Sequence, residues 1–238
     1  MTKLSVNINK FATLRNARGG NRPDVLQTAK DCERFGAEGI TIHPRPDERH
    51  IRYDDVVALK DAVTTEFNIE GYPNKRYLEI IAMAHPTQAT LVPDPPDVLT
   101  SNAGWDTVKN HDFLKEIIIE LKSYGVRTSI FVEPNATMVE GAARCGADRV
   151  ELYTEAYARH YHESKENAIA PFAEAAKVAK TAGLEINAGH DLDLNNLKYM
   201  VNVIPEIDEV SIGHAIVCDA IYLGLENTIQ LYLRQLKK

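Results

Sequence analysis

The sequence has 238 residues, of which 44% are hydrophobic and 26% charged, and its 27 basic and 34 acidic side chains give a net charge of −7. This balance argues against general nucleic-acid binding, which needs a basic face, although it permits a local anion site. Met1–Val6 lacks the charged start and apolar core of a signal peptide, and no stretch reaches the ~18 uninterrupted apolar residues of a membrane span. We therefore expect a cytoplasmic protein that makes no membrane contact, of one large domain or two small ones.

The three cysteines, Cys32, Cys145 and Cys218, are odd in number, far apart and set in apolar, helix-like segments. This pattern favours buried thiols in a reducing compartment over disulfides. No CxxC or HExxH spacing occurs, so we expect no metal site built from local sequence.

Eight segments have strand-like patterns, and each is followed by a segment with helical spacing of apolar residues. The expected strands are Leu4–Asn9, Gly39–His43, Phe67–Tyr72, Gln88–Pro93, Arg127–Val132, Arg149–Thr154, Glu185–His190 and Glu209–His214. The expected helices cover approximately residues 23–35, 54–63, 73–84, 112–124, 134–145, 167–182, 195–203 and 215–236.

Four of the connections stand out by composition. Leu14–Pro23 is polar and contains paired glycines, which predicts a loop. Pro44–Arg52 is dense in charge, and Glu155–His162 is rich in Tyr and His. The long segment Asp94–Val108 is rich in Pro, Asp, Ser, Asn and Gly, and its length makes it a candidate lid or binding loop.

Strict strand-then-helix alternation predicts parallel strands joined by right-handed crossovers. Two architectures satisfy this pattern: a closed eight-stranded barrel and an open, doubly wound sheet. Eight units in this length favour the barrel, and no GxGxxG motif follows a strand to support a dinucleotide-binding sheet. The expected fold is a single α/β domain over residues 1–238, a (β/α)8 TIM barrel with extra short helices in its βα loops.

Ionisable and polar side chains recur at the carboxyl ends of the predicted strands, where barrels build their sites. They are Asn7, Asn9, Lys10, His43, Glu70, Glu151, His190 and His214. Taken singly, a strand-terminal His is more often structural, and a lone Glu often faces solvent or pairs with Arg. Taken together at one end of one barrel, they favour a single active site. Histidines and carboxyls with raised pKa values suit several proton transfers near neutral pH.

Two places in the sequence suit phosphate groups. Gly213-His214 joins the last strand to a helix, and Gly189-His190-Asp191 does the same after the seventh strand; backbone N–H groups at a helix start favour anions. Arg18 and Arg45 could contact a second phosphate. For Arg45 and His50, the alternative is a solvated charged loop in which Asp47 and Glu48 pair with them. Two anion sites in one mouth suggest two phosphorylated substrates.

Seven motifs of the chain resemble the pyridoxine 5′-phosphate synthase family, in the same order and spacing over essentially the whole sequence. They are ATLRNARGG (12–20), GITIHPRPDERHI (39–51), NIEG (68–71), LVPD (91–94), VELYT (150–154), NAGHDL (187–192) and IGHAIV (212–217). The resemblance implies a (β/α)8 barrel, a homo-octamer and no cofactor. It implies a transferase that condenses 1-deoxy-D-xylulose 5-phosphate with 3-amino-2-oxopropyl phosphate into pyridoxine 5′-phosphate, phosphate and water.

The resemblance also implies a role for each matching residue. His43 and Glu70 would accept protons, His190 would donate one, and Glu151 would stabilise charge in a transition state. The aminoketone phosphate would be held by Asn7, Arg18, Gly213 and His214. The deoxyxylulose phosphate would be held by Arg45 and His50, together with Thr100 or Ser101 from the long loop.

The chain departs from the family pattern at three places. Asn9-Lys10 stands where Asp-His is common, which puts proton transfer there in doubt but leaves Lys10 able to bind a hydroxyl or phosphate. Asp191 stands where glycine usually follows the strand-seven His, so a carboxylate lies beside an expected phosphate unless it turns away. Gly71-Tyr72-Pro73 replaces a small apolar run after Glu70.

Two other functions stay open from the residues themselves. One is an isomerase or aldolase barrel that acts on a single sugar phosphate; a Schiff-base aldolase is less attractive because Lys10 is the only lysine near the site and the other strands supply none. The other is a non-catalytic barrel that binds a phosphorylated ligand, with Asn9-Lys10 marking lost chemistry.

Overall fold

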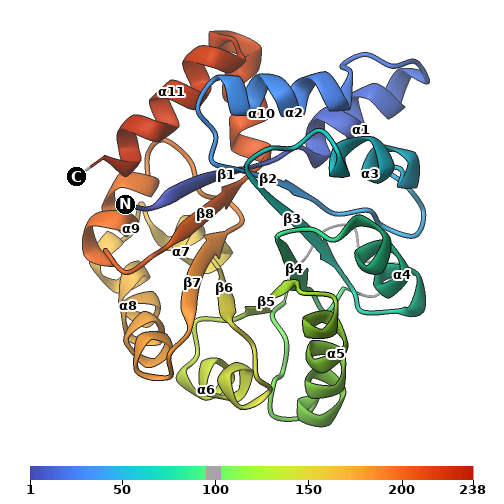
Figure 1. Ribbon diagram of the computed structural model, residues 1–238. Coiled ribbons are helices and arrows are strands. Elements are labelled where there is room, and N and C mark those ends of the chain that lie inside the picture. The colour runs from blue at the N-terminus through green and yellow to red at the C-terminus, as the bar shows by residue number, and fades with distance from the viewer. Residues whose placement is uncertain (95–102, 238) are drawn as a thin grey trace.

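The strands close into one parallel barrel. A computed structural model describes residues 1–94 and 103–237, and within them the strands pair in chain order, with β8 returning to β1 (Figure 1). The strands are β1 Lys3–Asn7, β2 Gly39–Ile42, β3 Glu66–Gly71, β4 Gln88–Leu91, β5 Arg127–Val132, β6 Arg149–Tyr153, β7 Glu185–Gly189 and β8 Glu209–Ile212. The closed barrel is confirmed, and the open sheet is excluded.

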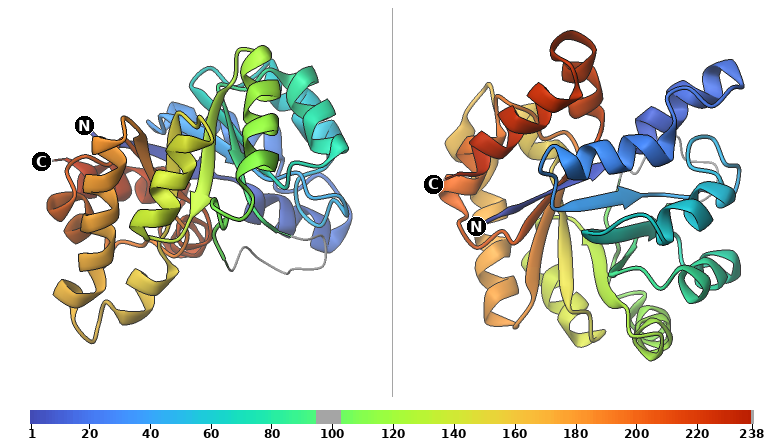
Figure 2. Two further views of the ribbon diagram at one scale, coloured as in Figure 1. Left: turned by 90° about the horizontal axis from the view of Figure 1, so that it is seen from below. Right: turned by 45° about the horizontal axis from the view of Figure 1, so that its top comes forward.

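Helices surround the barrel on the outside, as two further views show (Figure 2). They are α1 Asn9–Arg18, α2 Val25–Arg34, α3 Tyr53–Lys60, α4 Lys75–Ala84, α5 His111–Ser123, α6 Ala136–Arg144, α7 Glu155–His160, α8 Lys165–Thr181, α9 Leu197–Val203, α10 His214–Leu223 and α11 Leu225–Leu236. The predicted extra helices are present: α1 follows β1 and the short α7 follows β6 before the longer crossover helix begins.

Two helix predictions are wrong in part. The segment predicted as a polar loop from Leu14 belongs to α1 up to Arg18, because a face of Phe11, Ala12 and Arg15 is buried and Gly19 closes the helix in the left-handed region at φ 79°. The single last helix is two helices, since Gly224 has φ 77°, a conformation that ends α10 and that glycine adopts without strain.

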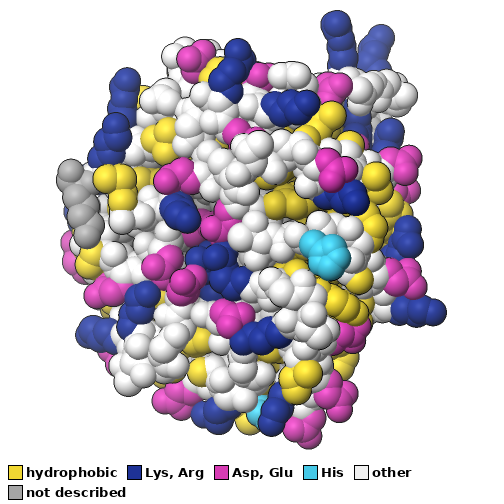
Figure 3. Space-filling model, viewed as in Figure 1, with side chains coloured by type: hydrophobic (Ala, Val, Ile, Leu, Met, Phe, Trp, Pro, Cys, Tyr) yellow, Lys and Arg dark blue, Asp and Glu magenta, His cyan; other side chains and the backbone are white. Residues whose placement is uncertain are grey.

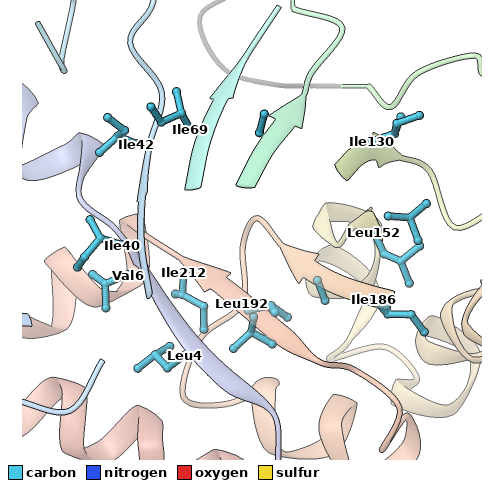
Figure 4. Close-up of a cluster of buried hydrophobic side chains, with 14 of the residues drawn as sticks. Leu4, Val6, Ile40, Ile42, Ile69, Ile130, Leu152, Ile186, Leu192 and Ile212 are labelled. Carbon is cyan, nitrogen blue, oxygen red and sulfur yellow. The ribbon is translucent and has the colours of Figure 1, made fainter. Parts of the chain in front are cut away.

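Each strand presents different chemistry on its two faces because side chains alternate. Leu4 and Val6 of β1 belong to the apolar layer between strands and helices, where Figure 4 shows them near Ile40 and Ile212 of the adjacent strands. On the opposite face, the Ser5 hydroxyl bonds that of Thr41 at 2.8 Å. The barrel interior is therefore polar, and its carboxyls are less exceptional there than the sequence suggested.

Paired charges fill the end of the barrel where the strands begin. Arg149 of β6 is 4% exposed and lies 3.2 Å from Glu66, 2.5 Å from Glu185 and 3.4 Å from Glu209. Arg127 also contacts Glu66. Figure 3, drawn in the orientation of Figure 1, shows basic and acidic side chains side by side near the middle of this face. We call this group of five residues the basal ion cluster.

The cysteine prediction holds at two of its three positions. Cys32 and Cys145 are buried, whereas Cys218 is exposed on α10, with its sulfur 3.6 Å from His214 Nε2. Burial raises the pKa of Cys32 to about 12, so this thiol is unreactive near neutral pH. No helix within residues 1–94 and 103–237 is long and apolar enough to span a membrane.

Candidate active site

A cavity of about 580 Å³ opens at the carboxyl ends of the strands. Its lining includes most of the residues predicted from the sequence, drawn from segments throughout the chain. The predicted residues that line it are Asn7, Asn9, Lys10, His43, Arg45, His50, Glu70, Glu151, His190, Asp191, Gly213 and His214. The structure thus brings the strand ends together as expected.

His43 and Glu70 face each other across β2 and β3. His43 Nδ1 lies 3.9 Å from Glu70 Oε2, beyond hydrogen-bond distance, and both side chains are largely buried. The Asn7 amide donates weakly to the same carboxyl oxygen at 3.4 Å, and Asn9 Oδ1 accepts the backbone N–H of His43 at 2.9 Å. Asn9 therefore anchors the residue that follows β2 to the start of α1.

Burial sets unusual protonation states on this side of the cavity. It raises the pKa of Glu70 well above its ordinary value, and the neighbouring carboxyls of Glu151 and Asp94 raise it further. Burial also lowers the pKa of His43 well below its ordinary value, with the Arg45 guanidinium adding to the effect. These shifts favour the protonated form of the Glu70 carboxyl and the neutral form of the His43 imidazole.

Glu151 is 3% exposed in the middle of β6, and its Oε2 has no hydrogen-bond partner within the described parts of the chain. Burial raises the pKa of Glu151 to about 7, although His190 and Arg149 act to lower it. Its carboxyl fits against Gly189 of β7: a Cβ at that position would come within 2.3 Å of Glu151 Oε1. A side chain at position 189 would therefore displace the Glu151 carboxyl from this place.

Two basic side chains of the charged loop after β2, Arg45 and His50, are buried rather than solvated. Arg45 is 4% exposed and pairs with Asp94 at 2.6 Å, and His50 is 8% exposed. Asp47 pairs with Arg49, and Glu48 Oε1 accepts the backbone N–H of Tyr53. The alternative in which Asp47 and Glu48 hold Arg45 and His50 in solvent is wrong, because the basic side chains are turned inward.

His50 is fixed as a neutral hydrogen-bond donor. Burial, followed by the charge of Arg45, lowers its pKa to about 4. Its Nδ1 accepts the backbone N–H of Ile51 at 2.9 Å, so the ring proton resides on Nε2. The backbone carbonyl of His50 accepts from Arg15 at 3.0 Å and from Asn16 at 2.8 Å.

Arg15 is a supporting residue that the sequence reading missed. It is 2% exposed, forms a two-pronged ion pair with Asp55 at 2.5 and 2.9 Å, and ties α1 to the loop that carries His50. The spacing of Phe11, Ala12 and Arg15 is that of one helix face and indicates α1. The paired glycines that follow favour a loop prediction for the same segment.

The other side of the cavity is built by β7 and β8. His190 Nδ1 lies 2.6 Å from Asp191 Oδ2, and the His190 ring meets Tyr153 edge-on with centroids 5.0 Å apart. Gly213 caps α10, and His214 begins it. The predicted anion site at a helix start after β7 is wrong: α9 begins at Leu197, close to its predicted start, so no helix dipole acts at Gly189–Asp191.

Comparison with known proteins places the chain in a family. Residues 4–238 match the family model described as pyridoxal phosphate biosynthesis protein PdxJ. The chain belongs to this family. It is 65% identical over 238 residues to the pyridoxine 5′-phosphate synthase of Cytophaga hutchinsonii, with all of both chains covered. It is 59% identical over 237 residues to the protein of the same name from Christiangramia forsetii, again with both chains fully covered.

Solved structures with little sequence similarity share the fold alone. Phosphoribosylanthranilate isomerase from Thermotoga maritima superposes with a TM-score of 0.63 at 11% identity, covering 99% of this chain and 98% of that one. Thiamine phosphate pyrophosphorylase from Pyrococcus furiosus superposes with a TM-score of 0.64 at 10% identity, covering 98% of this chain and 95% of that one.

Of the predicted site residues that the structure describes in this PdxJ family member, Arg18 alone does not line the cavity. Arg18 is exposed at the end of α1, and Thr100 and Ser101 lie outside the described residues, as does most of the predicted lid. The cavity also has lining residues that the sequence reading did not select: Thr13, Arg49, Val92, Phe131 and Ser211. Thr13, Arg49 and Val92 lie within the motifs that resemble the family, whereas Phe131 and Ser211 lie outside them. Closure of the barrel brings all five side chains to the mouth.

Proposed function

We propose that this chain is a pyridoxine 5′-phosphate synthase, a transferase that condenses 1-deoxy-D-xylulose 5-phosphate with 3-amino-2-oxopropyl phosphate into pyridoxine 5′-phosphate, phosphate and water. Its membership of the PdxJ family and its 65% identity to a pyridoxine 5′-phosphate synthase support the assignment. The same similarity weighs against an isomerase, an aldolase or a non-catalytic ligand-binding barrel.

The observation that carries the proposal is the contrast in protonation among the groups of one cavity. Glu70 and Glu151 have raised pKa values and His43 a lowered one, so carboxyls that hold protons face a neutral imidazole that can take one. A condensation that forms a ring while losing water and phosphate needs repeated proton movement between such groups.

The four groups take distinct roles in this proposal. His43 accepts a proton first, because it is neutral in the resting site. Glu70 acts as an acceptor only after it has given up its own proton, so it begins as a donor and then alternates. Glu151, with a pKa of about 7, carries negative charge for part of the cycle and stabilises cationic imine character that develops beside it. His190 donates protons to departing oxygen.

Two phosphate positions complete the proposal. The aminoketone phosphate binds near Asn7, Gly213 and His214, where the first N–H groups of α10 favour an anion. The deoxyxylulose phosphate binds near Arg45 and the Nε2–H of His50. Lys10 lies exposed at the mouth, where its ammonium suits a phosphate or hydroxyl. Asn9 supports this wall through the His43 backbone. Arg18, with Thr100 or Ser101, remains a proposed phosphate contact.

We further propose that residues 1–238 act as one catalytic domain without a cofactor, in the cytoplasm and as a homo-octamer. Exposed apolar side chains on α10 support self-association: Ile221 is 68% and Tyr222 88% exposed. Ile229 on α11, in contrast, is fully buried within its own chain. Light scattering coupled to size-exclusion chromatography would measure the mass of the assembly.

The direct test is to incubate purified protein with both substrates and to quantify pyridoxine 5′-phosphate by chromatography and released phosphate by a colorimetric assay. Equal amounts of both products are expected, and none when either substrate is omitted. A folded protein that forms no product, or that converts one sugar phosphate without the aminoketone, would contradict the proposal.

A further inference from the structure

The turn after β7 brings two ionisable side chains together in an uncommon backbone conformation. His190 and Asp191 have φ values of 80° and 59°, so two consecutive residues other than glycine occupy the left-handed region. Side chains in this region are sterically disfavoured, although Asp and His are tolerated better than most. The turn persists because its neighbours hold it on both sides.

Both ends of the turn are anchored by hydrogen bonds. Thr154 donates its backbone N–H to the Gly189 carbonyl at 3.0 Å, and its hydroxyl contacts the Gly189 and His190 carbonyls. The Asn196 amide donates to the Asp191 carbonyl at 3.2 Å. These contacts fix the backbone so that the Asp191 carboxylate lies 2.6 Å from His190 Nδ1.

The short contact determines which ring nitrogen of His190 carries a fixed proton. The hydrogen bond with His190 lowers the pKa of Asp191, so its carboxyl is ionised near neutral pH and can only accept. His190 Nδ1 must therefore donate. The Tyr153 ring packs edge-on against the imidazole and limits its rotation. Among the described residues, Tyr153, Glu151 and His214 are titratable groups that interact with this pair.

We propose that Asp191 is a positioning residue: its carboxylate holds His190 with Nδ1 protonated, so that Nε2 is the nitrogen that exchanges protons with the substrate. When His190 acts as a donor, its Nε2–H proton passes to the departing oxygen, and the Nδ1 proton stays on the ring in its bond to Asp191. The inference rests on the proposed function, and it assigns Asp191 a role other than a direct contact to phosphate, which its negative charge would disfavour.

A double-mutant cycle tests whether Asp191 acts through His190. Asp191→Gly removes the carboxylate at a position whose φ of 59° suits glycine, so folding is preserved. We expect kcat to fall at least about tenfold, with KM for both substrates changing less than about threefold. In a His190→Asn background, the same change should lower kcat less than about twofold. Equal losses in both backgrounds, or no loss in the first, would overturn the proposal.

Two further variants separate hydrogen bonding from local charge. Asp191→Asn keeps an acceptor oxygen and tolerates the left-handed turn, so kcat should stay within about fivefold of wild type. Asp193→Asn is the matched control, because Asp193 caps the backbone N–H groups of Asn195 and Asn196 and has no contact with His190. A fall in kcat in this control as large as that in Asp191→Gly would show that local negative charge is responsible, and would refute the positioning role of Asp191.

A measurement without turnover distinguishes failure of this inference from failure of the proposed function. The imidazole N–H bonded to Asp191 should give a far-downfield proton NMR signal at low temperature in the substrate-free protein. The signal should be present in wild type and Asp193→Asn, and absent in Asp191→Gly and His190→Asn. Its persistence in Asp191→Gly would refute the pair, whereas the expected pattern in a protein that forms no pyridoxine 5′-phosphate would refute only the proposed function.

Discussion

The two ends of the barrel bury carboxyl groups to the same extent but surround them differently. Glu209 in the basal ion cluster is 1% exposed, lies 3.4 Å from the Arg149 guanidinium and accepts the Asn187 amide at 3.2 Å. Glu151 at the mouth is 3% exposed and has an oxygen without a hydrogen-bond partner in the described structure. Burial raises the pKa of both, and nearby cations oppose it at each end: Arg149 and Arg127 for Glu209, and His190 and Arg149 for Glu151. Only Glu209 has, in addition, a hydrogen-bond donor, Asn187, that lowers its pKa.

This difference indicates that buried charges at the base of the barrel stabilise the structure, whereas buried carboxyls at the mouth serve the chemistry. A buried carboxylate with a cation and a hydrogen-bond donor contributes a fixed charge that cannot easily change state. A buried carboxyl without them holds a proton that it can give up. If this contrast is right, changes at the mouth should affect turnover, and changes at the base should affect stability.

The largest effect is expected from Glu70→Gln. Glutamine matches the shape of the protonated carboxyl but cannot transfer a proton, so turnover should fall about 10²- to 10⁴-fold. The free energy of unfolding near pH 7 should be unchanged or higher, because the folded protein no longer has to keep Glu70 protonated against its ordinary pKa. Chemical denaturation and the condensation assay together measure both quantities. Turnover near wild type would remove Glu70 from the mechanism.

At the base, Arg149→Met should cost stability. The change leaves Glu66, Glu185 and Glu209 without their shared guanidinium, and breaking one partner of a buried ion pair costs about 3–5 kcal/mol. Urea denaturation near pH 7 would measure the loss in the free energy of unfolding. A cost below about 1 kcal/mol would show that the base is no more dependent on pairing than the mouth.

The mouth should also give a distinctive pH dependence of stability. The folded pKa of Glu151 is about 7, above an ordinary value of 4.5. A raised acid pKa contributes stability that is present in full below the unfolded value and is lost as pH rises through the folded value. As pH rises from 4.5 to 7, the free energy of unfolding of the wild type should therefore fall by roughly 3 kcal/mol relative to that of Glu151→Gln. Parallel stability curves for the two proteins would contradict the raised pKa.

The smallest effect is expected from Glu185→Gln. Glu185 contacts Arg149 at 2.5 Å, but its side chain is 49% exposed, and Arg149 keeps Glu66 and Glu209. Solvent-screened pairs contribute at most about 1 kcal/mol, so thermal denaturation should show only a small shift. A loss as large as that of Arg149→Met would mean that the half-exposed member dominates the basal ion cluster.

Much of this site could be predicted from local sequence. His43, Glu70 and His190 lie at or just beyond the ends of strands that the residue pattern predicts, and parallel strands must bring those ends to one face. Glu151 lies in the middle of β6, in a strand that the pattern also predicts. Arg15 and Phe131 were missed because their contribution depends on which face of α1 or β5 turns inward. The helical state of Leu14–Arg18 was missed because burial of one face overrode a polar composition.

The sequence by itself determined the alternation of strands and helices, the parallel barrel and the order of ionisable residues along it, because periodicity and strand ends are local properties. Only the tertiary structure decided the protonation of those residues. Glu70 and Glu209 are the same residue type at opposite ends of one lumen, and the partners that distinguish them come from other strands: His43 after β2 for Glu70 and Arg149 of β6 for Glu209. The same holds for Asp191: only the turn after β7 aims its carboxylate at His190, since backbone torsion sets the direction of a side chain.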